Sequence, residues 1–307
     1  MRRLIGVAVA LAAVSVAVAM SCGVPADPRA PGTRVPAGAP LPLAVEEEPG
    51  DPEPDPNAPP VALAPPGGAI IQQGIVRIPK PKIDLGGQRR VGIQIGHLRT
   101  EDVPNEYGTR IQQQTGTSWE GITEVDITSE IADRMAAMLN AQGVVVDILP
   151  TTVPEGYLAD AFIALHCDGD GVGEQSGFKM AHGSRRGPYE DALIAAIKDV
   201  YAKATGLSYD VTHISSAMRG YYAFNWGRYQ HATSPFTPAT IIELGYLSND
   251  DDRALLLDHA DLIATALANG ILTFLDDTPR SKIFGADLLV PQTPIRQGPL
   301  RSPTTPP

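Results

Sequence analysis

Four polar residues stand directly beside apolar segments of the chain. They are His97, Glu124, His166 and Glu243. Three of them follow short apolar runs that are typical of strands, and Glu124 opens a segment with helical spacing. Functional groups of parallel sheets gather just beyond the carboxyl ends of the strands, so we expect these side chains to converge. Two imidazoles and one carboxylate match a zinc site that leaves a fourth position for water, and the second carboxylate is then free to move protons.

Each of these residues also has a simpler structural interpretation. A single histidine at a strand end is usually a hydrogen-bonded polar group, and Glu124 fits a first-turn acid that the helix dipole favours. Glu243 is harder to explain in this way, because an ionised carboxylate directly after an apolar strand needs a partner to offset its desolvation. Spacing and composition therefore leave both interpretations open.

The elements that would position these residues alternate along the chain. Apolar runs predict strands at Arg90–Gly96, Val144–Leu149, Phe162–Leu165 and Thr240–Ile242, with Ser176–Ala181 as a further candidate. Helical spacing predicts helices at Thr123–Gln142, Tyr189–Thr205 and Asp258–Asp276. This alternation predicts an α/β fold, a three-layer sandwich with a largely parallel twisted sheet flanked by helices.

The prolines divide the chain of 307 residues into a foldable part and two extended ends. Fourteen of the 29 prolines lie between residues 23 and 68. Proline fixes φ and removes a backbone donor, so we expect residues 22–70 to form a disordered, acidic tether. We place a folded domain at 89–277 and a disordered, proline-rich tail at 278–307.

The first 21 residues have the pattern of an export signal. Two arginines precede an uncharged apolar run that is short for a membrane span, and small residues follow it. Cys22 then resembles the acylated cysteine of bacterial lipoproteins, although Ala19 stands where leucine is usual, and Ala19 and Ser21 also suit an ordinary signal peptidase. We favour a lipoprotein with Cys22 as its first mature residue, anchored in the membrane and facing the cell wall. Without acylation the protein is released.

Charge and cysteine content exclude several other classes. The formal net charge is −11, and 22 basic against 35 acidic residues remain after the signal, which argues against a nucleic-acid partner. The sequence has two cysteines, so no disulfide framework supports the fold. We interpret Cys167 as a small buried residue near a strand end.

Four blocks of the sequence resemble the zinc-dependent N-acetylmuramoyl-L-alanine amidases of the Amidase_3 type. They are Val91–His97, Thr123–Asp126, Ala159–His166 and Ile241–Asn249, and the region that they cover runs from about residue 89 to 277. The last two blocks are the specific ones, since they look like the family's Ala-Asp-x-Phe-Ile-Ser-Ile-His and Val-Glu-x-Gly-Phe-Leu-Ser-Asn motifs.

The resemblance implies a role for each of the four residues. His97, Glu124 and His166 would bind Zn²⁺, and Glu243 would be the catalytic acid/base. The implied substrate is peptidoglycan, at the amide that joins the lactyl group of N-acetylmuramic acid to L-alanine. Two alternatives stay open: a non-catalytic cell-wall binding or regulatory lipoprotein on the same fold, and a zinc peptidase that cuts within the stem peptide.

Several positions depart from the family pattern. Its Asp-Pro-Gly-His-Gly-Gly is Gln94-Ile95-Gly96-His97-Leu98-Arg99 here, so Leu98 and Arg99 replace glycines and are expected to narrow or re-aim the substrate groove. Asp168 stands where the family has asparagine. A further hypothesis is that Arg99 contacts a stem-peptide carboxylate.

Residues outside the four blocks receive ordinary interpretations. The aromatic run Tyr221–Trp226 fits core packing better than a platform for sugar or peptide. The remaining histidines are interpreted as mostly surface residues: His182, His213, His231 and His259.

Overall fold

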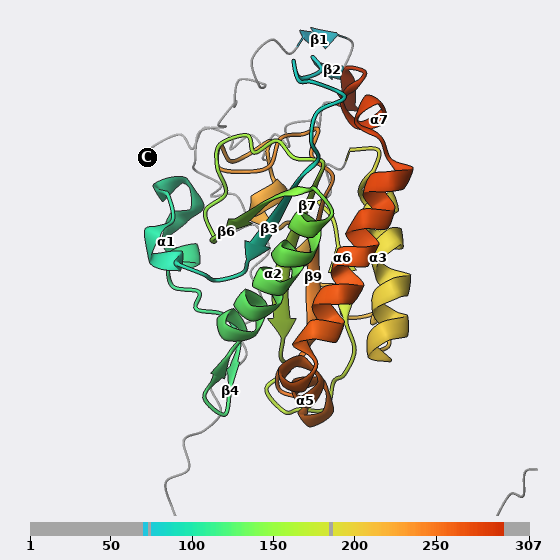
Figure 1. Cartoon of the computed structure of the whole chain (residues 1–307). Coiled ribbons are helices and arrows are strands. Elements are labelled where there is room, and N and C mark those ends of the chain that lie inside the picture. The colour runs from blue at the N-terminus through green and yellow to red at the C-terminus, as the bar shows by residue number, and fades with distance from the viewer. Residues whose placement is uncertain (1–69, 73–74, 184–186, 292–307) are drawn as a thin grey trace, which may run out of the picture. The chain divides into compact units, whose positions relative to one another are not determined.

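The computed structural model describes residues 70–72, 75–183 and 187–291, and its centre is a five-stranded sheet (Figure 1). The strand order is β6-β3-β7-β9-β8, and the first four strands run parallel while β8 is antiparallel to β9. The strands are β3 (Arg90–Ile95), β6 (Val145–Leu149), β7 (Ala161–Asp168), β8 (Lys179–Ala181) and β9 (Ala239–Tyr246). The α/β fold with a largely parallel sheet flanked by helices is confirmed.

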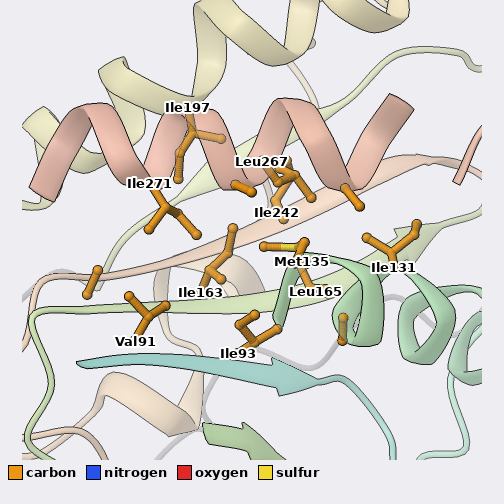
Figure 2. Close-up of a cluster of buried hydrophobic side chains, with 14 of the residues drawn as sticks. Val91, Ile93, Ile131, Met135, Ile163, Leu165, Ile197, Ile242, Leu267 and Ile271 are labelled. Atoms are coloured by element: carbon orange, nitrogen blue, oxygen red, sulfur yellow. The ribbon is translucent and has the colours of Figure 1, made fainter. Parts of the chain in front are cut away.

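Three long helices cover one face of this sheet. They are α2 (Glu124–Ala141), α3 (Glu190–Thr205) and α6 (Ala260–Asp277), and α6 packs against both of the others (Figure 1). Branched side chains of β3, β7 and β9 meet apolar side chains of these helices, as Figure 2 shows for Ile93, Leu165, Met135 and Leu267. Burial of this apolar layer supplies the main driving force for folding.

Short helices and loops cover the opposite face. The short helices are η1 (Thr100–Asp102), η2 (Asn105–Tyr107), α1 (Gly108–Gln112), α4 (Ser216–Arg219) and η3 (Tyr222–Phe224). A second apolar cluster joins these segments to the sheet through buried side chains such as Tyr107, Phe162 and Tyr222. The flanking layer on this side is therefore thinner and more irregular than the helical one.

Strand alternation separates apolar from polar side chains between the two faces. In β7, Ile163 and Leu165 belong to the helical-side core, while His166 contacts Tyr221 on the other side. Successive side chains of a strand point to opposite faces, so the same rule places Gln94, Lys179 and Glu243 on the side of His166. Four neighbouring strands thus present polar groups to the thinner layer.

Two expected strand ends and one expected helix start differ from the structure. β7 continues through His166 to Asp168 and β9 continues through Glu243 to Tyr246, because these residues pair with each other across the two strands. The last predicted helix, Asp258–Asp276, starts at Ala260 as α6, because a separate and unpredicted helix, α5 (Asp250–Asp258), ends just before it. Asn249 caps α5, and its side chain accepts two backbone N–H groups. Thr123 caps α2 as expected.

No single helix within the described residues has the length and apolar character needed to cross a membrane. By length and composition alone, α5 and α6 would meet that test only as a pair bent by 81°.

A second, small sheet joins the two ends of the described chain. β2 (Ile75–Ile78) pairs antiparallel with β1 (Ile70–Gln72) on one side and β10 (Leu288–Pro291) on the other. Together with α7 (Arg280–Phe284), β10 lies inside the expected disordered tail 278–307, so ordered structure extends to residue 291 and the predicted boundary was too early. The expected signal, Cys22, nearly all of the tether and residues 292–307 lie outside the described residues.

Asp160 ties the start of β7 to the start of β3 and to α7. Its fully buried carboxylate accepts the backbone N–H of Arg90 at 2.8 Å and Nε of Arg280 at 2.9 Å, and Nε of Arg89 lies 3.0 Å away. A carboxylate removed from water in this way is stable only with such partners. The aspartate of the Ala159–His166 block is therefore a structural anchor.

We predict that Asp160→Asn lowers the free energy of unfolding by on the order of 3 kcal/mol, since it leaves two largely buried guanidinium groups without their counter-charge. Urea denaturation measures this directly. The control is Asp102→Asn, which removes an exposed pair with Arg99 and should cost less than about 1 kcal/mol. Equal losses in the two variants would contradict the anchoring role.

Candidate metal centre

The fold brings three of the four predicted site residues into one buried group. His97 follows β3, Glu124 is the first residue of α2, and His166 lies in β7. One possible ligand atom from each lies within 4.8 Å of the others. Oε1 of Glu124 is 2.9 Å from Nδ1 of His166 and 3.6 Å from Nε2 of His97. The prediction that these side chains converge is confirmed.

Hydrogen bonds on the far side of each imidazole orient the rings. Nδ1 of His97 lies 3.1 Å from the carbonyl oxygen of Gln114. A carbonyl only accepts, so Nδ1 carries a proton, and Nε2 is the ring nitrogen that faces Glu124. On the other ring, Nε2 of His166 lies 2.9 Å from the hydroxyl of Tyr221, and Nδ1 faces Glu124. Such outer contacts are typical of metal-ligating histidines.

Backbone N–H groups hold the carboxylate of Glu124. Thr117 donates to Oε2 at 2.7 Å and Cys167 donates to Oε1 at 3.3 Å. Burial raises the pKa of Glu124, but attraction to His97 and the hydrogen bond with His166 outweigh it and keep that pKa below its ordinary value. An ionised carboxylate with two imidazole nitrogens is the N/O donor set that Zn²⁺ accepts, so the residues present fit this metal.

Two glycines allow the ligands to approach so closely. A Cβ on Gly96 would lie 2.2 Å from the His166 ring, and a Cβ on Gly116 would lie 2.8 Å from His97 and 2.9 Å from Glu124. Gly116 also has φ of +80°, a conformation that favours glycine. Side chains at either position would displace the ligands.

We predict that Gly116→Ala weakens Zn²⁺ binding by about tenfold or more, the scale of disturbances just outside a metal's ligands. Gly121→Ala is the matched control, because Gly121 has a similar φ of +84° but no atom within 4 Å of the added Cβ. Both variants carry the backbone strain, and only the first pushes on ligands. Titration against a chromophoric chelator measures the affinities, and equal affinities would refute a packing role for Gly116.

Glu243 lies beside this group, on the next strand. It pairs with His166 across β7 and β9, is 5% exposed, and lines the same cleft of about 530 Å³ as the three possible ligands. A carboxylate in this place can exchange protons with a water held by the group. The structure therefore brings all four predicted residues to one cleft.

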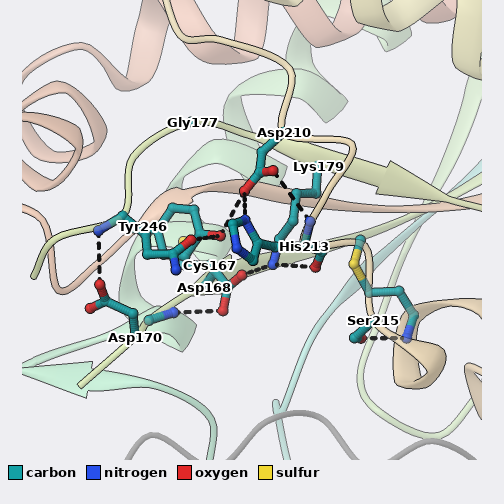
Figure 3. Close-up of polar contacts among 12 residues, drawn as sticks. Cys167, Asp168, Asp170, Gly177, Lys179, Asp210, His213, Ser215 and Tyr246 are labelled. Atoms are coloured by element: carbon teal, nitrogen blue, oxygen red, sulfur yellow. Dashed lines mark hydrogen bonds and ion pairs between the residues drawn. The ribbon is translucent and has the colours of Figure 1, made fainter. Parts of the chain in front are cut away.

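A polar network forms the wall of the cleft beyond Glu243 (Figure 3). Lys179 forms an ion pair with Asp168, donates to the carbonyl oxygen of His213 at 3.1 Å, and lies over the ring of Tyr246. Nδ1 of His213 lies 2.7 Å from a carboxylate oxygen of Asp210, which also accepts the hydroxyl of Tyr246. This network thus joins a lysine, a histidine and two carboxylates.

The same contacts fix the charge of Asp210. Burial raises its pKa, but hydrogen bonds from Thr212, His213 and Tyr246 lower it to about 2. Burial and the neighbouring Asp210 raise the pKa of Tyr246. At neutral pH Asp210 is therefore ionised and Tyr246 is a neutral phenol, and of these two residues Tyr246 lines the cleft.

Two residues of this wall, His213 and Lys179, are not among the predicted site residues. His213 is exposed, as expected for a surface histidine, and it also lines the cleft. The sequence signal for Lys179 is its place in the candidate strand Ser176–Ala181. His182 forms a hydrogen bond with Asp191, and His231 forms one with Glu106; neither histidine lines the cleft. His259 is exposed at the end of α5.

Leu98 and Arg99 do not narrow the cleft. Leu98 packs against the helical-side core, and the exposed Arg99 forms an ion pair with Asp102 at 2.9 Å; neither lines the cleft. Neither side chain therefore narrows the cleft as one of its lining residues, and the hypothesis that Arg99 contacts a stem-peptide carboxylate stays a prediction. His97 and Arg99 have φ of 59° and 62°, in the left-handed region. Arg99 stands where the family motif ends in glycine, so a residue with a side chain occupies a conformation that favours glycine.

Two sequence-based interpretations agree with the burial of the side chains. Cys167 is fully buried, and desolvation with the nearby Glu124 and Glu243 raises the pKa of its thiol well above the ordinary value. Tyr221, Tyr222 and Phe224 are buried in the second apolar cluster, which confirms core packing for that aromatic run.

A buried His-Glu-His group with a further carboxylate, at one edge of a largely parallel sheet, is the arrangement of a metal-dependent hydrolase. The family model described as N-acetylmuramoyl-L-alanine amidase, Amidase_3, matches residues 91–273, which is more than half of the chain. The chain belongs to this family. The resemblance noted in the sequence, and with it the prediction of an N-acetylmuramoyl-L-alanine amidase, is confirmed.

This chain is also similar to solved structures that are described as such amidases. Ami1 from Mycobacterium smegmatis is 20% identical with a TM-score of 0.48, and the match covers 64% of this chain and all of that one. AmiC2 of Nostoc punctiforme is 19% identical with a TM-score of 0.44, covering 62% of this chain and 98% of that one. No protein with a curated description matches the sequence.

Proposed function

We propose that this protein is a zinc amidase, in which His97, Glu124 and His166 hold Zn²⁺ and Glu243 is the catalytic acid/base. The bond cleaved is the amide between the lactyl group of N-acetylmuramic acid and L-alanine of the peptidoglycan stem peptide. The observation that carries this proposal is the set of three donor atoms within 4.8 Å of one another, in the same cleft as Glu243.

The chemistry divides between the metal and the protein. When bound, Zn²⁺ lowers the pKa of water from about 15.7 toward 7 and polarises the scissile carbonyl. Glu243 accepts the proton of the attacking water and returns it to the amine of the leaving L-alanine. Glu124 contributes one negative charge and the two histidines contribute none, so Zn²⁺ and these three ligands together carry one net positive charge, which the carboxylate of Glu243 can balance.

The wall of the cleft suits a polar peptide substrate. Lys179, Asp168 and His213 offer both donors and acceptors beside Glu243, and they lie on the same side of the sheet edge. A peptide amide next to a sugar presents the complementary groups. Few apolar side chains line the cleft, and Met218 is one of them.

We predict that Glu243→Gln retains Zn²⁺ but loses about 10²- to 10⁴-fold in rate, the usual contribution of a general acid/base. His166→Ala should lose Zn²⁺ and activity together. The control is Glu101→Gln, an exposed carboxylate outside the cleft, which should retain both. Metal content and mass spectrometry of the products released from purified peptidoglycan by the full zinc-loaded chain provide the readouts.

The products distinguish the amidase from its alternatives. Free stem peptides that begin with L-alanine establish the amidase, and shortened stems still attached to muramic acid would indicate a peptidase instead. Protein that sediments with the wall and releases nothing would indicate the binding protein. A normal rate for Glu243→Gln would remove that residue from the mechanism.

We also propose that the chain is exported and anchored through an acylated Cys22, with the proline-rich segment as its tether. The support is the sequence alone: the charged start, the apolar run and the cysteine that follows. Cys22→Ser should move the protein from the membrane fraction to the soluble fraction of producing cells. Wild-type protein that is already soluble would refute the anchor.

A further inference from the structure

A chain of buried hydrogen bonds extends from His166 into the thinner layer of the fold. Nε2 of His166 lies 2.9 Å from the hydroxyl of Tyr221, which lies 3.0 Å from Oε1 of Gln94. Nε2 of Gln94 donates to the carbonyl oxygen of Thr151 at 2.8 Å and to the hydroxyl of Tyr222 at 3.2 Å. Tyr222 in turn donates to the same carbonyl at 3.1 Å.

The far end of this chain fixes the direction of every bond. The carbonyl of Thr151 only accepts, so the amide nitrogen of Gln94 must face it and Oε1 must face Tyr221. That oxygen also only accepts, and the Tyr222 hydroxyl, 3.3 Å from that of Tyr221, gives its own proton to Thr151, so the proton of Tyr221 points away from His166 with either partner. The Tyr221 oxygen then presents lone pairs to His166, so Nε2 of the imidazole donates to it, and Nδ1 of the ring faces Oε1 of Glu124 at 2.9 Å.

We propose that Tyr221 is a positioning residue that accepts the Nε2–H of His166 and so holds the imidazole ring with Nδ1 directed at Glu124, the side on which the metal would bind. The inference deepens the proposed function and rests on it, in that it takes the His97–Glu124–His166 group as a metal site. Tyr221 touches neither the substrate nor the metal. It acts through the ligand, as outer hydrogen-bond partners do at many metal sites.

Packing alone does not account for a tyrosine at this position. Tyr221 is 3% exposed, and its ring packs on Tyr222 and Phe224 with centroid separations of 4.5 and 5.4 Å. A phenylalanine would make the same ring contacts without the cost of burying a hydroxyl. That hydroxyl is instead directed at a ligand, and the His166 ring meets the Tyr221 ring edge-on at 5.3 Å.

Because Gln94 replaces the aspartate of the family motif, the chain of hydrogen bonds behind His166 contains no charged side chain. Gln94 stands where the family motif has aspartate, is fully buried, and supplies both an acceptor for Tyr221 and donors for Thr151 and Tyr222. An amide fixes direction at both of its ends, whereas an ionised carboxylate only accepts. The orientation of His166 in this protein therefore comes from a chain of uncharged hydrogen-bonding groups that starts at the backbone carbonyl of Thr151.

The test compares Tyr221→Phe with Tyr222→Phe, which removes the same atom from the neighbouring ring but leaves the contact with His166. We expect Tyr221→Phe to weaken Zn²⁺ binding by about 10- to 100-fold, the usual effect of losing such a partner. Tyr222→Phe should bind Zn²⁺ nearly as wild type, because Gln94 keeps its bond to Thr151. Chelator competition measures both affinities without any substrate.

A second readout reports the tautomer directly. In zinc-loaded wild type and zinc-loaded Tyr222→Phe, nitrogen-15 NMR of the imidazole should show His166 with its proton on Nε2, and Tyr221→Phe should lose this preference. Unchanged affinity and tautomer in Tyr221→Phe, or equal losses in both variants, would overturn the proposal. Zinc binding that depends on Tyr221 in a protein that releases no stem peptides would refute the amidase and leave this role intact.

Discussion

A buried carboxylate between two imidazoles is the interaction on which the rest of this site depends. Glu124 is almost completely removed from water, and an ion in that position needs several compensating contacts. Backbone donors at Thr117 and Cys167 and the two histidines supply them. These contacts require a helix start, a strand and two loops to meet at one point, so the geometry of the site constrains the fold around it.

One face of the sheet buries most of the apolar core, and the other face carries the polar groups of the site. The helical face is apolar and buries most of the branched side chains, whereas the other face carries Gln94, His166, Lys179 and Glu243 under a layer of short helices and loops. Polar groups in that thinner layer find partners among loop carbonyls and hydroxyls, which a second layer of long helices would not offer. The cleft opens on this side because the covering segments are irregular there.

The departures from the family motif have separate structural consequences. Leu98 and Arg99 alter the turn after β3, and both side chains lie away from the cleft. The backbone at Arg99 has a left-handed conformation, which costs free energy for a residue with a side chain. Gln94 lies deeper, where its amide both accepts from Tyr221 and donates to Thr151, whereas the family's aspartate, when ionised, can only accept.

The α/β class, most helices and strands, and the four residues that meet in the cleft can be predicted from the sequence. Periodicity and caps are local properties, so Thr123 and the apolar runs predict the elements, and the four motif blocks indicate the four residues. The distant groups that complete the cleft become known only from the packing of the folded chain. Lys179, His213 and Tyr221 come from segments between the motifs, and their roles depend on strand pairing and on the path of loops, which no local pattern encodes. The same holds for the directions of Leu98 and Arg99, because a left-handed turn, and not the sequence order, decides where these side chains point.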